Sequence, residues 1–174
     1  GANRLGGNSL SEILVFGKIV GIAASAFCKQ SNFNSFSKEV INSAYENIRI
    51  HNCSGSANNY ALQKQLQNIM WNFCGVYKNE RDLNKALLKL NEIKKLTYKT
   101  NPNANKNKIQ NLIDAFNLEA SLYSAESTII SSLERKESRG AHQRSDFKMI
   151  NENFDFNILI KLENSNLIAH KKKV

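Results

Sequence analysis

The chain has 174 residues, 24 Lys and Arg against 15 Asp and Glu, and a formal net charge of +9. A hydrophobic content of 41% with only one proline excludes a disordered or collagen-like chain and favours long helices over a many-stranded barrel. A complete dinucleotide-binding oxidoreductase needs about twice this length, so that class is excluded for the chain by itself.

Helical periodicity begins at the N-terminal end of the chain. Residues 1–7 read as a glycine-rich loop, and Asn8 or Ser9 is expected to cap a helix that Glu12 supports as in a capping box. Apolar residues then recur at helical spacing as far as Cys28. Lys18 and two glycines interrupt this stretch, so we expect neither a membrane span nor a signal peptide.

Four further helices are predicted along the chain. A short one follows at residues 37–48, and the next carries an apolar stripe over residues 62–73. Another begins near Glu80, and the longest runs over residues 106–136. The last three should hide their apolar stripes against one another in an antiparallel three-helix bundle.

The C-terminal part changes character after Glu137. Residues 156–162 read as a strand, residues 164–166 as a turn and residues 167–170 as a return strand. The fold class expected is therefore mainly α, with a possible β-hairpin at the C-terminal end and an exposed lysine tail at residues 171–173.

Common catalytic motifs do not occur in the sequence. The chain contains no GxSxG, GxGxxG or GxxxxGK[ST] string, and its three cysteines include no CxxC pair, so neither a zinc site nor a disulfide framework is indicated. Two segments remain as candidate sites. In residues 1–10 a glycine loop opens a helix beside Arg4, a pattern suited to an anion or a polarised carbonyl. Residues 137–147 gather two arginines, a histidine and two acids around Gly140. Either segment could instead be an ordinary helix start or a solvated charge cluster.

Three strings resemble the flavoprotein subunit of succinate dehydrogenase and fumarate reductase. They are GANRLGGNSL followed by VFGK, LQNIMW with a following Gly-Val, and ESRGAHQRSDF. The resemblance covers nearly the whole chain, but only the C-terminal third of such a subunit. The related L-aspartate oxidases share NRL and NSL and usually carry Ala-Ser where this chain has Gly6-Gly7, which favours the dicarboxylate enzymes.

The resemblance implies roles for individual residues. Arg4 would bind a carboxylate of succinate or fumarate, and Asn8 would hold the loop. Ser9 by its side chain and Leu10 by its backbone N–H would contact the pyrimidine edge of FAD. Arg139, His142 and Arg144 would belong to an interdomain clamp that folds back on the flavin-binding domain and supports the site.

The same resemblance implies the domain organisation. Residues 1–35 would end the FAD-binding domain, residues 36–136 would form the helical bundle, and residues 137–174 would form the C-terminal segment. The family's dinucleotide fold, its flavin-linking histidine and its arginine proton donor lie upstream of such a stretch. We therefore expect a fragment that does not retain FAD and is inactive without the N-terminal flavin-binding region.

The expected partners and location follow from the family too. An iron–sulfur subunit is the expected protein partner, a dicarboxylate is the substrate, and nucleic acid is not expected. The parent would lie in the cytoplasm, or on the cytoplasmic or matrix side of a membrane through partner subunits, and would not be secreted. Two alternatives stay open from the sequence, namely the C-terminal region of an L-aspartate oxidase and a basic, non-enzymatic helical interaction module.

Overall fold

The computed structural model describes residues 8–32, 35–51, 58–97 and 108–173. The chain divides into two compact units, Gly1–Ala44 and Tyr45–Val174. The domain boundaries at residues 35/36 and 136/137 that the family resemblance implies stay predictions. Each unit is described by itself below.

The first unit is dominated by helix α1, Asn8–Gln30. None of its residues is buried in the structure, and large apolar side chains such as Leu14 and Phe27 are 75% and 70% exposed. The helix has 23 residues and contains an 18-residue window with a mean hydropathy of 1.7, so it is long and apolar enough to cross a membrane by length and composition alone. The expectation that it does not span a membrane stays a prediction. The core helix of a water-soluble protein passes the same test of length and composition.

Helix α2, Lys38–His51, lies across the boundary between the two units. The hydroxyl of Ser37 accepts a hydrogen bond from the backbone N–H of Val40 at 3.3 Å, which satisfies one of the free donors at the start of the helix. Ile41, Tyr45 and Ile48 share an apolar face by helical spacing and are 42–67% exposed.

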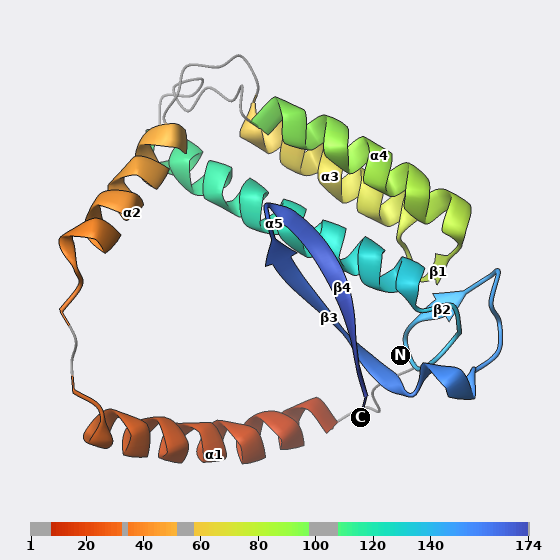
Figure 1. Cartoon of the computed structure of the whole chain (residues 1–174), viewed down its shortest axis with the longest axis horizontal. Coiled ribbons are helices and arrows are strands. Elements are labelled where there is room, and N and C mark those ends of the chain that lie inside the picture. Colours follow the sequence, from red (N-terminus) through yellow and green to blue (C-terminus); the bar gives the residue numbers. More distant parts are fainter. Residues whose placement is uncertain (1–7, 33–34, 52–57, 98–107, 174) are drawn as a thin grey trace. The chain divides into compact units, whose positions relative to one another are not determined.

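The core of the second unit is a three-helix bundle of α3 (Asn59–Phe73), α4 (Glu80–Thr97) and α5 (Lys108–Glu134). Figure 1 shows α3 and α5 running one way and α4 running the other way, as an antiparallel bundle requires. Each helix contributes an apolar stripe to one core, because each stripe is stable only when the other two cover it. The buried members are Leu62, Leu66, Leu83, Ala86, Leu90, Ile93, Leu118, Leu122, Ala125 and Ile129.

Asparagines start two of these helices. The side chain of Asn58 accepts hydrogen bonds from the backbone N–H groups of Tyr60 and Ala61 at 2.9 and 3.3 Å and so caps α3. Asn79 caps α4 by accepting from the N–H of Asp82 at 2.9 Å, and its own amide donates to the Asp82 carboxylate at 2.8 Å. Both asparagines fix where the chain turns into the bundle.

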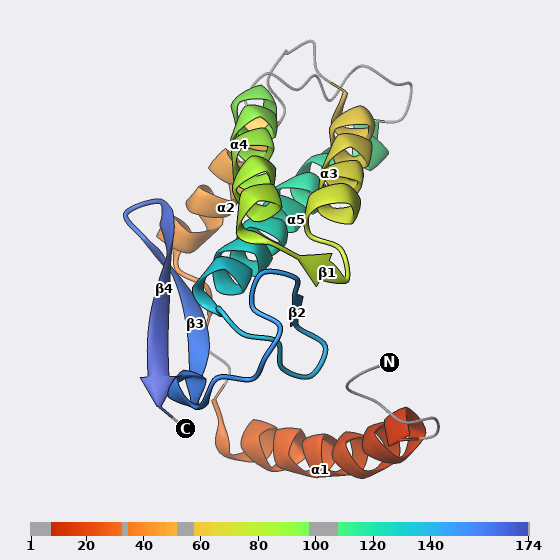
Figure 2. The ribbon, with the colours of Figure 1, turned by 90° about the vertical axis from the view of Figure 1, so that its right-hand side faces the viewer.

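Two short strands connect the α3–α4 turn with the segment that follows α5. Strand β1, Tyr77–Lys78, pairs in parallel with β2, Gln143–Arg144, at the end of the bundle where α3 turns into α4. This pairing brings the segment that follows α5 back to the α3–α4 connection, as Figure 2 shows from the side.

A β-hairpin of β3 (Phe156–Glu163) and β4 (Asn166–Lys173) follows a one-turn 3₁₀ helix at Glu152–Phe154 and packs against α5. Its two-residue turn has positive φ at both central positions, 48° at Asn164 and 65° at Ser165. Positive φ at both positions gives the turn the twist that the paired strands need.

The fold class expected from the sequence is confirmed. The helices, the three-helix bundle and the hairpin all form within the described residues, and α5 is only slightly shorter than expected. The lysine tail is exposed as expected, but residues 171–173 belong to β4 instead of a loose end.

Candidate functional site

The segment after α5 closes the end of the bundle around Arg144. This side chain is fully buried, and its guanidinium binds the Asp146 carboxylate through Nε–Oδ1 and Nη2–Oδ2 contacts of 2.8 Å each. Its Nη1 donates to the carbonyl oxygen of Ser132 and, at 3.5 Å, to that of Arg135 in the last turn of α5 and just beyond it. The negative end of the α5 helix dipole favours a cation at this position.

Asp146 carries the connection on to α4. Its Oδ2 accepts a hydrogen bond of 2.8 Å from the backbone N–H of Glu80, the first residue of that helix. The Arg144 guanidinium is the main reason that the pKa of Asp146 falls to about 2, and the Glu80 N–H lowers it further. Arg144 and Asp146 together therefore bind the end of α5 to the start of α4, and we call this pair the latch.

A fully buried carboxylate, Glu137, lies in the same segment as the latch. Its Oε1 accepts from Arg135 at 2.6 Å and from Arg139 at 2.9 Å, and its Oε2 accepts from the backbone N–H of Asn151 at 2.9 Å. Burial raises the pKa of Glu137, but the hydrogen bonds from Arg139, Asn151 and Arg135 outweigh it and bring the pKa to about 2. The carboxylate is therefore a fully satisfied anchor for the loop.

The loop between these two carboxylates is a tight turn. Arg139 and His142 exchange backbone hydrogen bonds of 2.9 and 3.0 Å around Gly140, whose φ of 57° suits glycine. The ring Nε2 of His142 lies 3.0 Å from the carbonyl oxygen of Arg135. Burial is the main cause that lowers the pKa of His142, so the ring is neutral at pH 7 and donates to that carbonyl.

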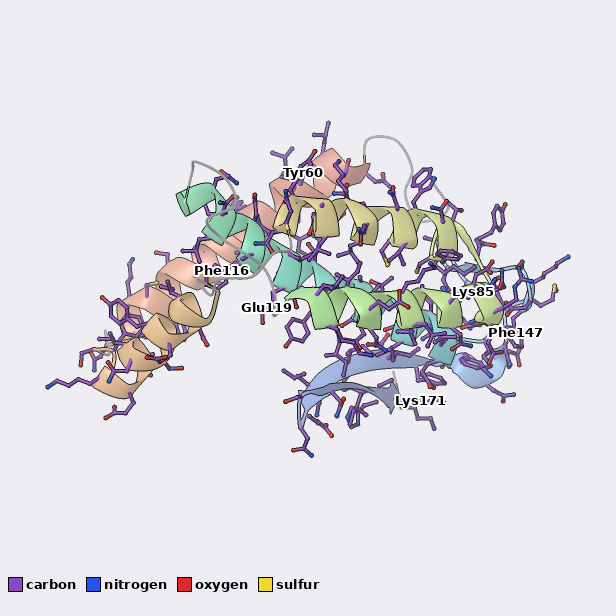
Figure 3. The ribbon with its side chains drawn as sticks, turned by 90° about the horizontal axis from the view of Figure 1, so that it is seen from above. Tyr60, Lys85, Phe116, Glu119, Phe147 and Lys171 are labelled. Carbon is purple, nitrogen blue, oxygen red and sulfur yellow. The ribbon has the colours of Figure 1, made fainter. Side chains whose placement is uncertain are left out.

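Ser138 is the polar centre of the same loop. Its hydroxyl accepts from the Arg144 N–H at 2.8 Å and donates to the Phe147 carbonyl at 2.8 Å. The Arg144 guanidinium also lies 5.0 Å from the centroid of the Phe147 ring. Figure 3 places Phe147 at this end of the bundle, and Tyr60 at the other.

The structure divides the residues predicted from the sequence into two groups. Arg4 lies outside the described residues. Asn8, Ser9 and Leu10 form the first turn of α1, so neither Asn8 nor Ser9 stands before the helix as the expected cap. The arginines and His142 of the second segment lie together after α5, as the motif predicts.

The sequence did not indicate which groups form the hydrogen bonds and ion pairs of this second segment. It grouped Arg144 with residues that support a site, but the side chain is enclosed and its partners all belong to this unit. The partners outside the segment that the sequence did not indicate are the carbonyls of Ser132 and Arg135, which accept from Arg144, and the N–H of Glu80, which Asp146 caps across 66 residues of sequence. The spacing of Arg144 and Asp146, two apart in an otherwise irregular stretch, was the available signal.

The start of α1 fits the flavin that the resemblance implies. The first N–H groups of a helix have no acceptor within the helix, and the first turn of α1 contains no acidic residue. Such a set of donors suits a negatively polarised carbonyl edge, such as the pyrimidine side of an isoalloxazine. Among the described residues, no group of three or more His, Cys, Asp or Glu side chains could hold a metal ion.

Residues 63–171 match the protein family described as fumarate reductase flavoprotein C-term. The chain belongs to the succinate dehydrogenase and fumarate reductase flavoprotein family. The matched residues include nearly all of the three-helix bundle, the latch and nearly all of the hairpin.

Individual relatives of the family agree. An FAD-dependent oxidoreductase of Methanocaldococcus jannaschii is 38% identical over 165 residues, which are 92% of this chain and 29% of that protein. The fumarate reductase flavoprotein subunit of Haemophilus influenzae is 30% identical over 154 residues, 84% of this chain and 25% of that subunit. A solved quinol fumarate reductase chain of E. coli superimposes with a TM-score of 0.85 and 27% identity over 100% of this chain and 31% of that one. The chain thus spans between a quarter and a third of the length of these family members.

Proposed function

We propose that these residues form the C-terminal part of an FAD-dependent flavoprotein that interconverts succinate and fumarate. The superposition of the whole chain on a quinol fumarate reductase at 27% identity is the observation that carries the proposal. FAD supplies hydride chemistry in such an enzyme, and the protein supplies binding, orientation and charge.

The N-terminal residues are proposed to serve the substrate and the flavin. The Arg4 guanidinium would hold a substrate carboxylate, for which its planar donor pair is well suited. The Ser9 side chain and the backbone N–H of Leu10 would face the pyrimidine edge of the flavin, where the positive end of α1 favours negative charge. Asn8 would hold the loop that joins the two.

The segment after α5 is proposed to serve as structural support for the domain interface. Arg144 is enclosed within its own unit, so it holds the loop in shape and does not touch substrate. Arg139 is 43% exposed along its side chain, and it is the guanidinium of this segment that another domain could reach. His142 stays neutral at physiological pH and orients the turn between them.

The partners of the longer protein are part of the proposal. The relatives include the flavoprotein subunit of a quinol fumarate reductase, which supports an iron–sulfur partner and a location at the membrane through partner subunits. The isolated 174 residues are expected to be inactive and to bind no flavin, because one edge of a cofactor site cannot enclose the cofactor.

The experiment is to express the longer protein that ends in these residues, with Arg4 intact or replaced by Met. The Arg4→Met enzyme should keep its flavin absorbance but lose about ten- to a hundredfold in kcat/KM for succinate, because one charge-assisted carboxylate contact is gone. The Arg81→Met variant, on an exposed surface of α4, is the matched control. Unchanged succinate turnover in Arg4→Met, or a parent that oxidises L-aspartate in preference to succinate, would overturn the assignment.

A further inference from the structure

The loop that follows the latch carries two large apolar side chains at the surface. Met149 is 80% exposed and Ile150 is 63% exposed. The loop begins after Phe147, which Figure 3 places at one end of the bundle. A single exposed apolar side chain is ordinary in a folded protein, but two in succession on a fixed backbone form a small apolar surface.

Buried groups hold the backbone of this loop in place. The backbone N–H of Ser138 donates to the Met149 carbonyl at 3.2 Å, and the Glu137 carboxylate accepts from the backbone N–H of Asn151 at 2.9 Å. Ser138 and Glu137 are 8% and 0% exposed. Because these hydrogen bonds lie on both sides of Ile150, the two apolar side chains stand on a rigid support. Such a preformed surface loses little conformational freedom on binding.

Arg139 lies beside the same loop and is held in one orientation. Its Nε donates to Glu137 Oε1 at 2.9 Å, and its Nη2 donates to the Asn151 carbonyl at 3.4 Å. The side chain remains 43% exposed, so the donors that these two contacts do not use are open to a further acceptor. Asp155 attracts the same guanidinium from beyond ion-pair distance, and the exposed Lys148 adds a second cation to the loop.

The charges of this segment do not balance. Its three arginines bind two carboxylates, since Glu137 is shared by Arg135 and Arg139 while Asp146 binds Arg144. One positive charge is therefore left over. Arg139 is the most exposed of the three arginines, with 43% against 18% for Arg135 and 0% for Arg144. A carboxylate from elsewhere would complete the set through the free edge of the Arg139 guanidinium.

We infer that Arg139, Met149 and Ile150 form one docking surface, and that it binds an acidic segment of the longer flavoprotein from outside these 174 residues. A carboxylate of that segment binds the guanidinium, and its apolar side chains cover Met149 and Ile150. The inference rests on the proposed function, which makes this chain part of a longer one. Arginine and methionine are among the residue types that are enriched in the centres of protein interfaces.

The size and charge of this docking surface favour a segment of the same polypeptide over other occupants. A separate protein needs about 800 Å² on each partner for a stable interface, far more than three side chains offer. A tethered segment needs less, because the connection raises its effective concentration. A second copy of this chain would bring another net charge of +9 against Arg139, which is unfavourable.

Methionine oxidation tests whether the surface is covered, because hydrogen peroxide converts an accessible methionine to its sulfoxide. Met149 oxidation is followed by mass spectrometry in the 174-residue chain and in the longer protein, purified as a single polypeptide. Met149 should react at least about tenfold more slowly in the longer protein, because covered side chains are exposed only by rare opening. Leu88→Met supplies a control methionine on α4, where Leu88 is 67% exposed, and should react equally in both proteins.

Equal oxidation of Met149 in both proteins would overturn the inference. Protection that rises with the concentration of the 174-residue chain, or that requires an added partner subunit, would also overturn it, since another chain would then cover the surface. The longer protein is assayed in parallel for bound flavin and for succinate oxidation. Succinate oxidation without protection of Met149 removes the docking inference alone, and protection without succinate oxidation removes the proposed function alone.

Arg139→Gln tests the carboxylate. The change leaves Glu137 bound to Arg135 and Asn151, so the Met149 rate in the 174-residue chain should not change. In the longer protein the same change should bring the Met149 rate to within about threefold of the rate in the 174-residue chain, because the carboxylate loses its cation. Arg139→Lys keeps the charge and should retain most of the protection. Full protection in Arg139→Gln would show that no carboxylate anchors the surface, which overturns the inference.

Discussion

Arg144 and Asp146 form a two-point contact, with both nitrogen–oxygen distances at 2.8 Å, between the end of α5 and the start of α4. The arrangement sets a cation at the carboxyl end of one helix and an anion at the amino end of another. Each charge is therefore favoured by a helix dipole as well as by its partner. In this family member the latch joins segments 66 residues apart in the sequence through charged and polar groups.

Replacing Arg144 by Met should destabilise the bundle by about 1–3 kcal/mol, because the change leaves the carbonyl of buried Ser132 without a donor and the solvent-accessible Asp146 carboxylate without its ion-pair partner. The free energy of unfolding from urea titrations measures this. Arg81→Met is the matched control, since Arg81 is 79% exposed and contacts Asp82 at 3.5 Å. It should shift the free energy by less than about 0.5 kcal/mol. Equal effects of the two changes would show that the latch is not enclosed.

Stability should fall on acidification between about pH 4.5 and pH 2. The pKa of Glu137 drops from its ordinary value of 4.5 to about 2 in the folded chain, so the unfolded chain binds its proton first as the pH falls. The contribution of Glu137 is thus complete above pH 4.5 and is lost as the pH approaches 2. Asp146, with a pKa of about 2, acts in the same direction.

The Glu137→Gln variant distinguishes the contribution of Glu137 to this loss of stability from that of Asp146. It should be less stable than the native chain at pH 7 and should show a shallower fall toward pH 2, because one titrating group has been removed. Urea midpoints measured at several pH values give both results. An unchanged slope in the variant would mean that Glu137 is not held as a carboxylate.

Leu90→Ala should cost about 2–5 kcal/mol of stability, because Leu90 is 1% exposed in the centre of the bundle and its removal leaves a cavity. Leu88, two residues away on the same helix, is 67% exposed. Leu88→Ala should therefore change the free energy of unfolding by no more than about 0.5 kcal/mol. A reversed order of the two effects would contradict the register of α4.

Ser165→Gly should stabilise the hairpin by about 0.5–1 kcal/mol, since Ser165 has a φ of 65° that only glycine adopts without steric cost. The thermal unfolding midpoint should rise accordingly. Ser165→Ala keeps the Cβ atom at the same φ and should bring no such rise. A gain in both variants would show that the turn, as described, is not the origin of the effect.

The sequence determined the helices, the bundle and the hairpin, because apolar residues at periods of 3.6 and 2 decide which faces must be hidden. It also singled out the ESRGAHQRSDF segment, since arginines, acids and a glycine in one short stretch mark a loop with fixed contacts. Together with GANRLGGNSL and LQNIMW, this string is enough to predict the family.

Only the tertiary structure decided what those charged residues bind. The fold encloses the Arg144 side chain against the end of α5, and its partner Asp146 binds the first residue of α4 from a solvent-accessible position. The hydrogen bonds from the amides of Asn59 and Gln63 to the Asn111 carbonyl and the Ser121 hydroxyl could not be read from the sequence either, since these acceptors lie more than 50 residues away along the chain. Local periodicity is a property of neighbouring residues, whereas hydrogen-bond satisfaction depends on which distant segments the fold brings together.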